Sequence, residues 1–209
     1  MTVEAPAIDE AFARPADAAA LDRAAAALRE NGFAVHVVDT VQDARALLGR
    51  LLPRDREIFT ASSETLRLSG IAADIDESGD YVSVRAQAGP PSADVWEQIR
   101  LGATPEVVVG SVHAVTEDGR LLAASASGSQ LAPYASGARR AYWVVGAQKV
   151  VPDVETGLRR IRSYSLPREH RRLQELYNQS SFVGRILILE REAFPDRGTV
   201  ILVREAIGF

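Results

Sequence analysis

The feature that most constrains the fold of this chain is an alternation of short apolar segments with segments whose apolar residues recur at helical spacing. Residues 33–38 have the near-continuous apolar character of a strand that a parallel sheet buries on both faces, and residues 57–61 form a second, shorter strand-like run. Residues 15–30 and 41–51 instead place leucine, valine and alanine three and four positions apart, which predicts amphipathic helices. This alternation is typical of right-handed crossover units. It predicts an α/β fold with a mostly parallel sheet flanked by helices.

The second half of the chain continues this pattern but ends differently. Residues 107–109 and 142–145 are further apolar runs, and both predict buried strands. The dipeptide Asp118-Gly119 is a strong turn signal that joins two short strands. Near the end, residues 185–190 and 199–204 are strand-like and are separated by turn-forming residues. They predict a C-terminal β-hairpin.

Length and composition fit one globular domain. The chain has 209 residues, of which 46% are hydrophobic and 25% are charged, so a single core over residues 1–209 is expected. We expect residues 1–14 to be flexible. Ser92 is expected to cap a helix that carries Trp96, and both Trp96 and Trp143 are expected in the core.

Charge and hydropathy exclude two classes of partner. The formal net charge of -4 argues against general affinity for nucleic acid or for anionic membrane surfaces. No apolar stretch approaches the ~18 residues that a membrane span needs, and the first residues lack the form of a signal peptide. A cytoplasmic location is therefore expected.

The chain contains no cysteine, which limits its chemistry. Disulfides, thiolate zinc sites, cysteine-bound iron–sulfur clusters and cysteine nucleophiles are all excluded. Only three scattered histidines remain as nitrogen ligands, so we expect no metal and no cofactor. The 24 basic residues comprise 23 arginines and a single lysine, Lys149.

The first candidate site follows the strand at residues 57–61. Ser62, Ser63 and Glu64 stand at the carboxyl end of that strand and at the start of a helix, where open α/β sheets bind ligands. Hydroxyl groups and free backbone amides there suit a phosphate or a carboxylate. The alternative is a plain helix cap without a ligand.

The second candidate site lies between residues 110 and 130, where small and hydroxylated residues concentrate. Glycine and serine let a ligand approach the main chain closely. Glu117 is a candidate base or nucleophile and His113 a candidate proton carrier. A solvated acid in a turn and a histidine satisfied within a strand are the alternatives. The candidate ligand-binding residues in this segment are Gly110, Ser111, Ser127, Gly128, Ser129 and Gln130.

Lys149 is the third candidate. It comes just after the apolar run at 142–145, at the end of a parallel strand that faces a cleft. A lysine there can hold an anionic substrate as a point charge, or act as a base or a Schiff-base amine if it is desolvated. The arginine-rich runs around residues 139–140 and 159–172 are instead expected to form solvated helical faces.

An ordered set of segments resembles the LUD domain, the lactate utilisation protein family, in the branch similar to lactate utilisation protein C. The resemblance is carried by Ser62–Ile71, Gly110–Gly119, Ser127–Gln130, Val144–Asp153, Arg159–Arg162 and Val200–Phe209. It implies a fold similar to phosphosugar isomerases and coenzyme A transferases, with ligands at the carboxyl ends of strands. Coenzyme A transferases carry an acyl group on a glutamate in a Ser-Glu-Asn-Gly turn, which the Thr116–Gly119 turn superficially resembles.

The resemblance also implies a function. The expected role is an accessory factor in oxidation of lactate or a related 2-hydroxy acid, which binds a small anionic metabolite and works with iron–sulfur proteins, with a homo-oligomer as a further expectation. Members of this branch often carry a cysteine cluster where this chain has residues 176–185 without cysteine, so no cluster is expected here. One alternative is an isomerase, hydrolase or acyl-transfer enzyme that uses Glu117. A second is an interaction module with an empty cleft.

Overall fold

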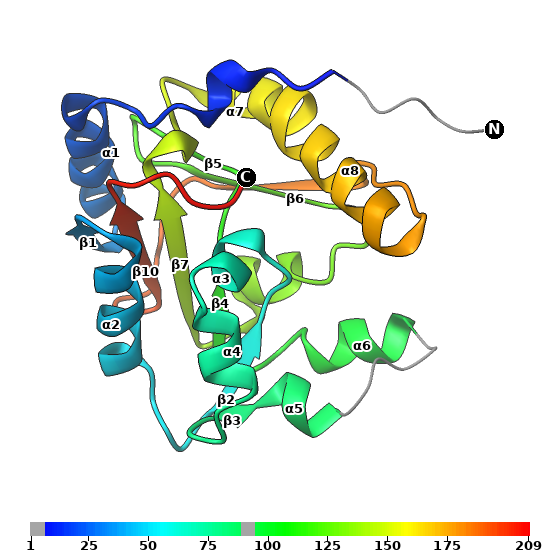
Figure 1. Ribbon diagram of the computed structural model, residues 1–209. Helices are drawn as coiled ribbons and strands as arrows, with labels where there is room; N and C mark the ends of the chain where they lie inside the picture. Colours follow the sequence, from blue (N-terminus) through cyan, green and yellow to red (C-terminus); the bar gives the residue numbers. More distant parts are fainter. Residues whose placement is uncertain (1–6, 89–94) are drawn as a thin grey trace.

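The computed structural model of the chain describes residues 7–88 and 95–209 and contains two sheets (Figure 1). The larger sheet is entirely parallel, with the strand order β1-β10-β7-β4-β2-β3. Its strands are β1 (Ala34–Val38), β2 (Glu57–Thr60), β3 (Val82–Ser83), β4 (Val107–Gly110), β7 (Arg140–Gly146) and β10 (Gly198–Val203). The prediction of a mostly parallel sheet flanked by helices is confirmed.

The smaller sheet has the order β8-β5-β6-β9 and mixes one parallel pair with two antiparallel pairs. Its strands are β5 (Ala114–Thr116), β6 (Leu121–Ser125), β8 (Val150–Val151) and β9 (Arg185–Leu189). The turn predicted at Asp118-Gly119 joins β5 to β6, and Gly119 has a φ of +85° there.

Helices surround both sheets. The α-helices are α1 (Ala18–Glu30), α2 (Val41–Leu51), α3 (Glu64–Leu68), α4 (Ile71–Asp76), α5 (Val84–Ala88), α6 (Val95–Leu101), α7 (Val154–Arg160) and α8 (Leu166–Tyr177). Two short 3₁₀ helices, η1 (Glu10–Ala13) and η3 (Ala147–Lys149), and two π-helical turns, η2 (Pro133–Gly137) and η4 (Ile161–Ser165), complete the set. Side-chain caps of Asp17, Thr40 and Asp153 begin α1, α2 and α7. None of the described helices is both long and apolar enough to cross a membrane.

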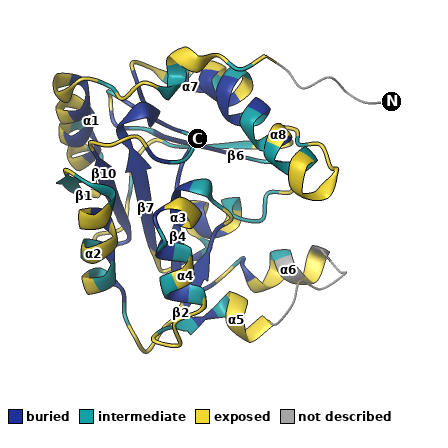
Figure 2. Ribbon diagram, in the orientation of Figure 1, coloured by how far each residue is buried: buried dark blue, intermediate teal, exposed yellow. Residues whose placement is uncertain are grey.

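Strand alternation divides the core of the large sheet into two faces. On one face, Ile58 and Val144 pack with the buried residues of α2, α3 and α4. On the other face, Phe59 and Trp143 pack with α1 and with the smaller sheet. The central strands are accordingly buried on both sides (Figure 2), as the near-continuous apolar runs predict.

The smaller sheet is itself buried on both faces. Leu121 and Ala123 of β6 contribute to the core beneath the large sheet, whereas Leu122 and Ala124 face a third cluster. That cluster is covered by α7, and Gly157 lets the helix approach Leu122 closely. The smaller sheet therefore lies between the large sheet and α7.

The predicted C-terminal β-hairpin is wrong. β10 pairs in parallel with both β1 and β7, inside the large sheet, whereas β9 pairs antiparallel with β6 in the smaller sheet. All six residues of β10 are buried, because its apolar run has no polar face to give to solvent. A strand of that kind is suited to the interior of a parallel sheet.

Three local predictions have different outcomes. Trp143 is fully buried, as expected, but Trp96 lies on α6 at the margin of the molecule with 71% of its surface exposed, so its assignment to the core is wrong. The cap expected at Ser92 lies outside the described residues. Within residues 1–14, residues 1–6 also lie outside them, while Asp9 caps η1 and donates its backbone N–H to the Ser163 carbonyl at 2.9 Å.

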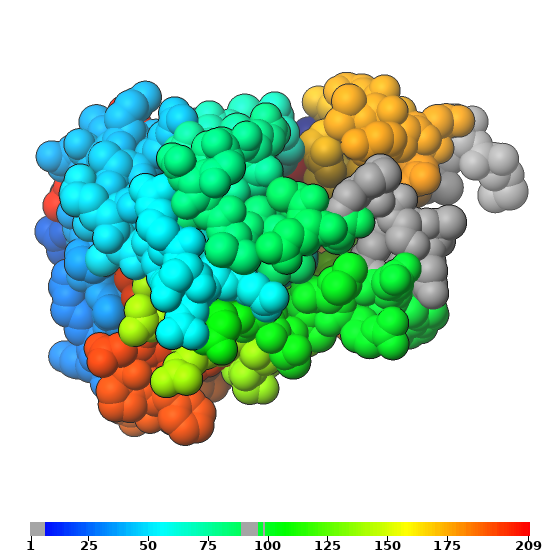
Figure 3. Space-filling model, turned by 90° about the horizontal axis from the view of Figure 1, so that it is seen from below, coloured from blue at the N-terminus to red at the C-terminus, as the bar shows by residue number. Residues whose placement is uncertain are grey.

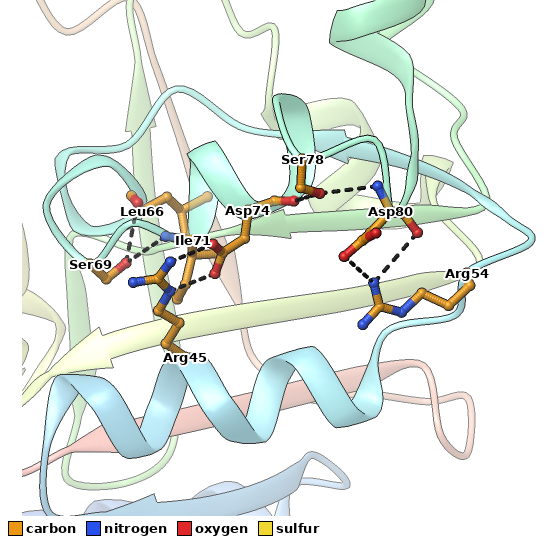
Figure 4. A network of polar contacts seen from close by, with 8 residues as sticks. All are labelled: Arg45, Arg54, Leu66, Ser69, Ile71, Asp74, Ser78 and Asp80. Atoms are coloured by element: carbon orange, nitrogen blue, oxygen red, sulfur yellow. Dashed lines mark hydrogen bonds and ion pairs between the residues drawn. The ribbon is translucent and has the colours of Figure 1, made fainter.

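A group of polar contacts fixes α3 and α4 against α2 (Figure 4). Arg45 of α2 forms a two-pronged ion pair with Asp74 of α4. Gly70 lies between α3 and α4 with a φ of +78°, and a Cβ there would stand 3.0 Å from the Arg45 guanidinium. The glycine thus allows both the left-handed turn and the close approach of the arginine.

Gly110 ends β4 where the backbone must leave room for a tyrosine. The Tyr134 hydroxyl accepts the Ser111 N–H at 3.1 Å and donates to the Ser111 carbonyl at 3.0 Å. A Cβ on Gly110 would stand 1.7 Å from that hydroxyl oxygen. Gly110 therefore lets Tyr134 hold the backbone of Ser111 in place.

We predict that G110A destabilises the protein by roughly 2–3 kcal/mol, because the added methyl group overpacks a buried site. The matched control is G49A, since a Cβ there meets only the Tyr81 hydroxyl at an ordinary 3.7 Å. Alanine within α2 should be neutral or stabilising by up to about 1 kcal/mol. Denaturant unfolding measures both, and equal stability of the two variants would contradict this account of Gly110.

Candidate functional site

A cleft of about 590 Å³ opens at the carboxyl ends of β2 and β4. Residues of α3 line one side, and residues of α8 and of the segment that follows it line the other (Figure 1). The loop after β6 and the C-terminal Phe209 contribute as well. Volumes of this size accommodate small-molecule ligands, and the position is the one at which open α/β sheets bind them.

Nine of the twelve candidate residues named from the sequence line this one cleft. They come from four separate segments of the chain: three follow strands β2, β4 and β7 of the parallel sheet, and the fourth follows β6 of the smaller sheet. The nine residues are Ser62, Ser63, Glu64, Ser111, His113, Ser127, Ser129, Gln130 and Lys149.

The other three candidates, Gly110, Gly128 and Glu117, are not among the described residues that line the cleft. Gly110 contacts Tyr134, and Gly128 donates its N–H to the Ser125 hydroxyl from a backbone with a φ of +88°. Both glycines therefore shape segments that border the cleft. Glu117 lies in the turn between β5 and β6 and pairs with Arg23 of α1 at 2.6 Å. The structure thus keeps Glu117 apart from the other candidate catalytic residues.

Lys149 lies at the floor of the cleft. Only 1% of its surface is exposed, and the residue ends η3, the short helix that follows the central strand β7. Its Nζ donates to the Thr65 hydroxyl at 2.9 Å and to the Ser111 hydroxyl at 3.0 Å. No described carboxylate forms an ion pair with it. The single lysine of the chain is therefore a buried amine held by two neutral groups.

The two hydroxyls direct their own protons away from Lys149. Ser111 Oγ donates to the Val144 carbonyl at 2.6 Å, and Thr65 Oγ1 donates to the Ile207 carbonyl at 3.3 Å. Each oxygen therefore presents a lone pair to Nζ. Burial, together with the nearby Arg160 charge, lowers the pKa of Lys149 well below its ordinary value.

His113 is a neutral neighbour of this lysine. Its Nδ1 accepts the Ala124 N–H at 3.1 Å, so the neutral ring carries its proton on Nε2. Burial lowers the pKa of His113 to about 3, and the charge of Arg160 adds to the effect. At neutral pH the ring is therefore an N–H donor that lines the cleft.

Arg160 was expected on a solvated helical face, and that prediction is wrong, because the side chain is fully buried. It donates through Nε to the Gln148 carbonyl and through Nη1 to the His113 carbonyl and the Ser165 hydroxyl. Its Nη2 has no hydrogen-bond partner among the described residues. Burial lowers the pKa of Arg160 to about 10, so it stays charged at neutral pH.

A signal for Arg160 was present in the sequence. Arg160 follows Gly157 by three positions and precedes Tyr164 by four, and both of these residues are buried. It therefore belongs to the apolar stripe of α7 and η4 and not to the charged face beside it. Assigning each arginine separately to a face of the helix would have placed Arg160 on the buried face and Arg159 and Arg162 on the solvated face.

Acidic side chains also line the cleft, but each has a partner. Glu64 pairs with Arg67 at 2.8 Å and approaches Arg172 of α8 at 3.8 Å, and these arginines help to lower the pKa of Glu64. Glu169 pairs with Arg172. Asp76 accepts hydrogen bonds from the Thr60 and Ser83 hydroxyls. The mouth thus carries paired charges, whereas the floor carries the Lys149 amine and the neutral His113 ring, with the buried Arg160 charge beside them and no described carboxylate partner.

A smaller hollow of about 350 Å³ lies at the opposite, amino-terminal edge of the large sheet. Figure 3 shows this face of the molecule. The hollow is lined by Pro53, Asp55, Arg56, Glu106, Val107, Arg139 and Arg140. Across the described residues, no group of three His, Cys, Asp or Glu side chains is arranged to hold a metal ion.

These features define a parallel α/β protein with a polar ligand cleft at the carboxyl edge of its sheet. The LUD domain model matches residues 21–203, and the chain belongs to the LUD domain family. No curated protein matches the chain. The crystal structure of a DUF162 family protein from Deinococcus radiodurans has a similar fold, with a TM-score of 0.55 and 13% sequence identity, and the match covers 90% of this chain and 99% of that one.

The lowered pKa of His113 predicts a specific loss of stability in acid. The unfolded chain binds a proton on this ring below about pH 6.5, whereas the folded protein resists doing so until about pH 3. The free energy of unfolding should therefore fall as the pH drops through this window, by up to about 1.4 kcal/mol per pH unit.

The variant H113Q lacks this titration, while it shares every carboxylate with the wild type. Below pH 6.5, we expect the free energy of unfolding of the wild type to fall relative to that of H113Q as the pH drops. Denaturant unfolding at several pH values measures it. A difference that stays constant between pH 4 and 7 would contradict the buried, neutral state of His113.

Proposed function

We propose that this LUD domain protein binds a small anionic metabolite in the cleft and serves as an accessory factor in the oxidation of lactate or a related 2-hydroxy acid. The observation that carries the proposal is the buried Arg160 cation beside the cleft floor, which holds the backbone carbonyls of His113 and Gln148 and has no described carboxylate partner. Burying an unpaired cation is costly, and an anion bound nearby offsets that cost. The name of the family supports lactate as the first metabolite to test.

The donors around the cleft suit a carboxylate or a phosphate. His113 offers its Nε2–H at the floor, and the hydroxyls of Ser62, Ser63 and Ser127 lie along the walls. Lys149 gains a third N–H when a bound anion draws a proton onto its amine, beside the two N–H groups that Thr65 and Ser111 accept. The Arg160 charge lies close enough to lower the pKa of both floor groups, so its field also favours an anion. These groups would fix the orientation of a small ligand by charge and by hydrogen bonds.

The proposal divides the work between this chain and its partners. Because the sequence has no cysteine, iron–sulfur proteins would carry the electrons while this protein holds the metabolite. A cytoplasmic setting and a homo-oligomer are parts of the same proposal. Leu176, Tyr177 and Phe182 are exposed apolar side chains close to the mouth of the cleft, where a partner protein could approach the bound ligand.

The alternative, an enzyme that uses Glu117, has less support. Glu117 pairs with Arg23 and stands in the turn after β5, which packs against the C-terminal end of α1 through Asn31. The cleft groups and Glu117 would have to act on different parts of one substrate. We therefore place the ligand in the cleft and assign Glu117 no part in holding it.

Binding of small anions is the test. We expect lactate, pyruvate or phosphate to raise the melting temperature of the wild type by mass action. K149M should bind the same anion about tenfold more weakly, since it lacks the amine that takes up a proton and donates its third N–H to the charged ligand. E117Q should bind it as tightly as the wild type does. Calorimetric titration measures the three affinities.

Two outcomes would count against the proposal. If none of these anions shifts the melting temperature, the cleft does not serve as a small-anion site. If E117Q loses affinity while K149M keeps it, the ligand lies near the β5–β6 turn and the alternative gains support. Circular dichroism of each variant shows that a loss of binding is not a loss of fold.

A further inference from the structure

We propose that Lys149 is a nucleophilic amine that forms an imine with the carbonyl carbon of a 2-oxo acid bound in the cleft. The inference rests on the proposed function, because the cleft must first admit an organic anion. It goes further by assigning a covalent activity and a substrate class to one residue. The geometry of the hydrogen bonds around Nζ carries the argument.

A neutral amine has two N–H bonds and one lone pair. Both N–H bonds of Lys149 are taken up by Thr65 and Ser111, at 2.9 and 3.0 Å. The hydroxyl protons of these two residues go to backbone carbonyls and are not directed at Nζ. The lone pair is therefore left free in the remaining tetrahedral direction, and Lys149 borders the cleft.

The surroundings favour the neutral amine over the ammonium form. Lys149 is buried, no described carboxylate pairs with it, and the charge that acts on it is that of Arg160, which is also positive. Both effects disfavour protonation and lower the pKa of Lys149. An amine activated in this way by desolvation and a neighbouring cation is the usual form of a Schiff-base lysine.

The same surroundings select the substrate class. A protonated imine places a positive charge at the cleft floor, where the described residues provide no carboxylate to Lys149. A 2-oxo acid brings its own carboxylate next to the carbon that reacts, so substrate and iminium balance each other. The Nε2–H of His113 lines the same cleft and can donate to a carbonyl oxygen.

The bond changes balance without an oxidant or a reductant. The Nζ lone pair attacks the carbonyl carbon, and one amine proton passes to the carbonyl oxygen to give a carbinolamine. That oxygen leaves as water with the second amine proton, and a carbon–nitrogen double bond remains. The imine then takes a proton from solvent, and hydrolysis reverses every step.

The presence of one lysine in the sequence makes the test clean. The protein is incubated with pyruvate and cyanoborohydride at pH 7, which reduces an iminium to a stable secondary amine, and is then digested and mapped by mass spectrometry. We expect the peptide that contains Lys149 to gain the mass of pyruvate less one oxygen atom. K149M should show no adduct at that position.

An ordinary lysine provides the control. Arg56 has a 60% exposed side chain outside the cleft, and R56K adds a surface amine to the otherwise wild-type protein. Lys149 should react at least about tenfold faster than the introduced amine, since each unit of lowered pKa increases the free-amine fraction tenfold. Because the adduct is mapped in R56K, the comparison does not depend on the folding of K149M.

Parallel binding measurements with lactate, which has no carbonyl carbon at position 2, separate this inference from the proposed function. If pyruvate and lactate both raise the melting temperature but Lys149 gains no adduct, or reacts no faster than the amine of R56K, the imine proposal is overturned and anion binding stands. If neither acid shifts the melting temperature and Lys149 is unmodified, the proposed function fails as well.

Discussion

The site depends on one interaction, the pair of hydrogen bonds from the Lys149 amine to Thr65 and Ser111. These bonds join three segments: Ser111 follows β4, Thr65 belongs to α3, and Lys149 follows β7. The amine thus fixes the carboxyl edge of the large sheet, where the cleft lies. Because both acceptors are neutral, the interaction positions Lys149 without supplying a counter-charge.

The supporting structure serves the same arrangement. Tyr134 holds the backbone of Ser111, and the absence of a side chain on Gly110 makes room for it. Arg160 holds the carbonyls of Gln148 and His113, so its buried charge stands behind the floor of the cleft. Ion pairs stay at the mouth, where solvent screens them. The molecule therefore keeps an uncompensated positive field where a ligand would bind.

Sequence reasoning predicted the α/β class and the parallel sheet, because periodicity reports burial. Nine of its twelve candidate residues line the cleft, since the carboxyl ends of parallel strands share one edge. It was wrong about the C-terminal strands, because β9 and β10 join different sheets and nothing in their local sequence specifies a distant partner. It missed Arg160, a cation hidden in an apolar stripe. It grouped Glu117 with His113 on proximity in sequence, whereas the turn carries Glu117 to α1.

The central claim is that burial keeps the pKa of the Lys149 amine well below its ordinary value, and nuclear magnetic resonance tests it directly. Lysine labelled with ¹³C at Cε enters the chain at one position only, so its signal belongs to Lys149 without further assignment. Titration of the folded protein should give a midpoint well below the ordinary lysine pKa of about 10.4. In denaturant, the same signal should titrate at that ordinary value. A midpoint at or above that value in the folded protein would contradict the account.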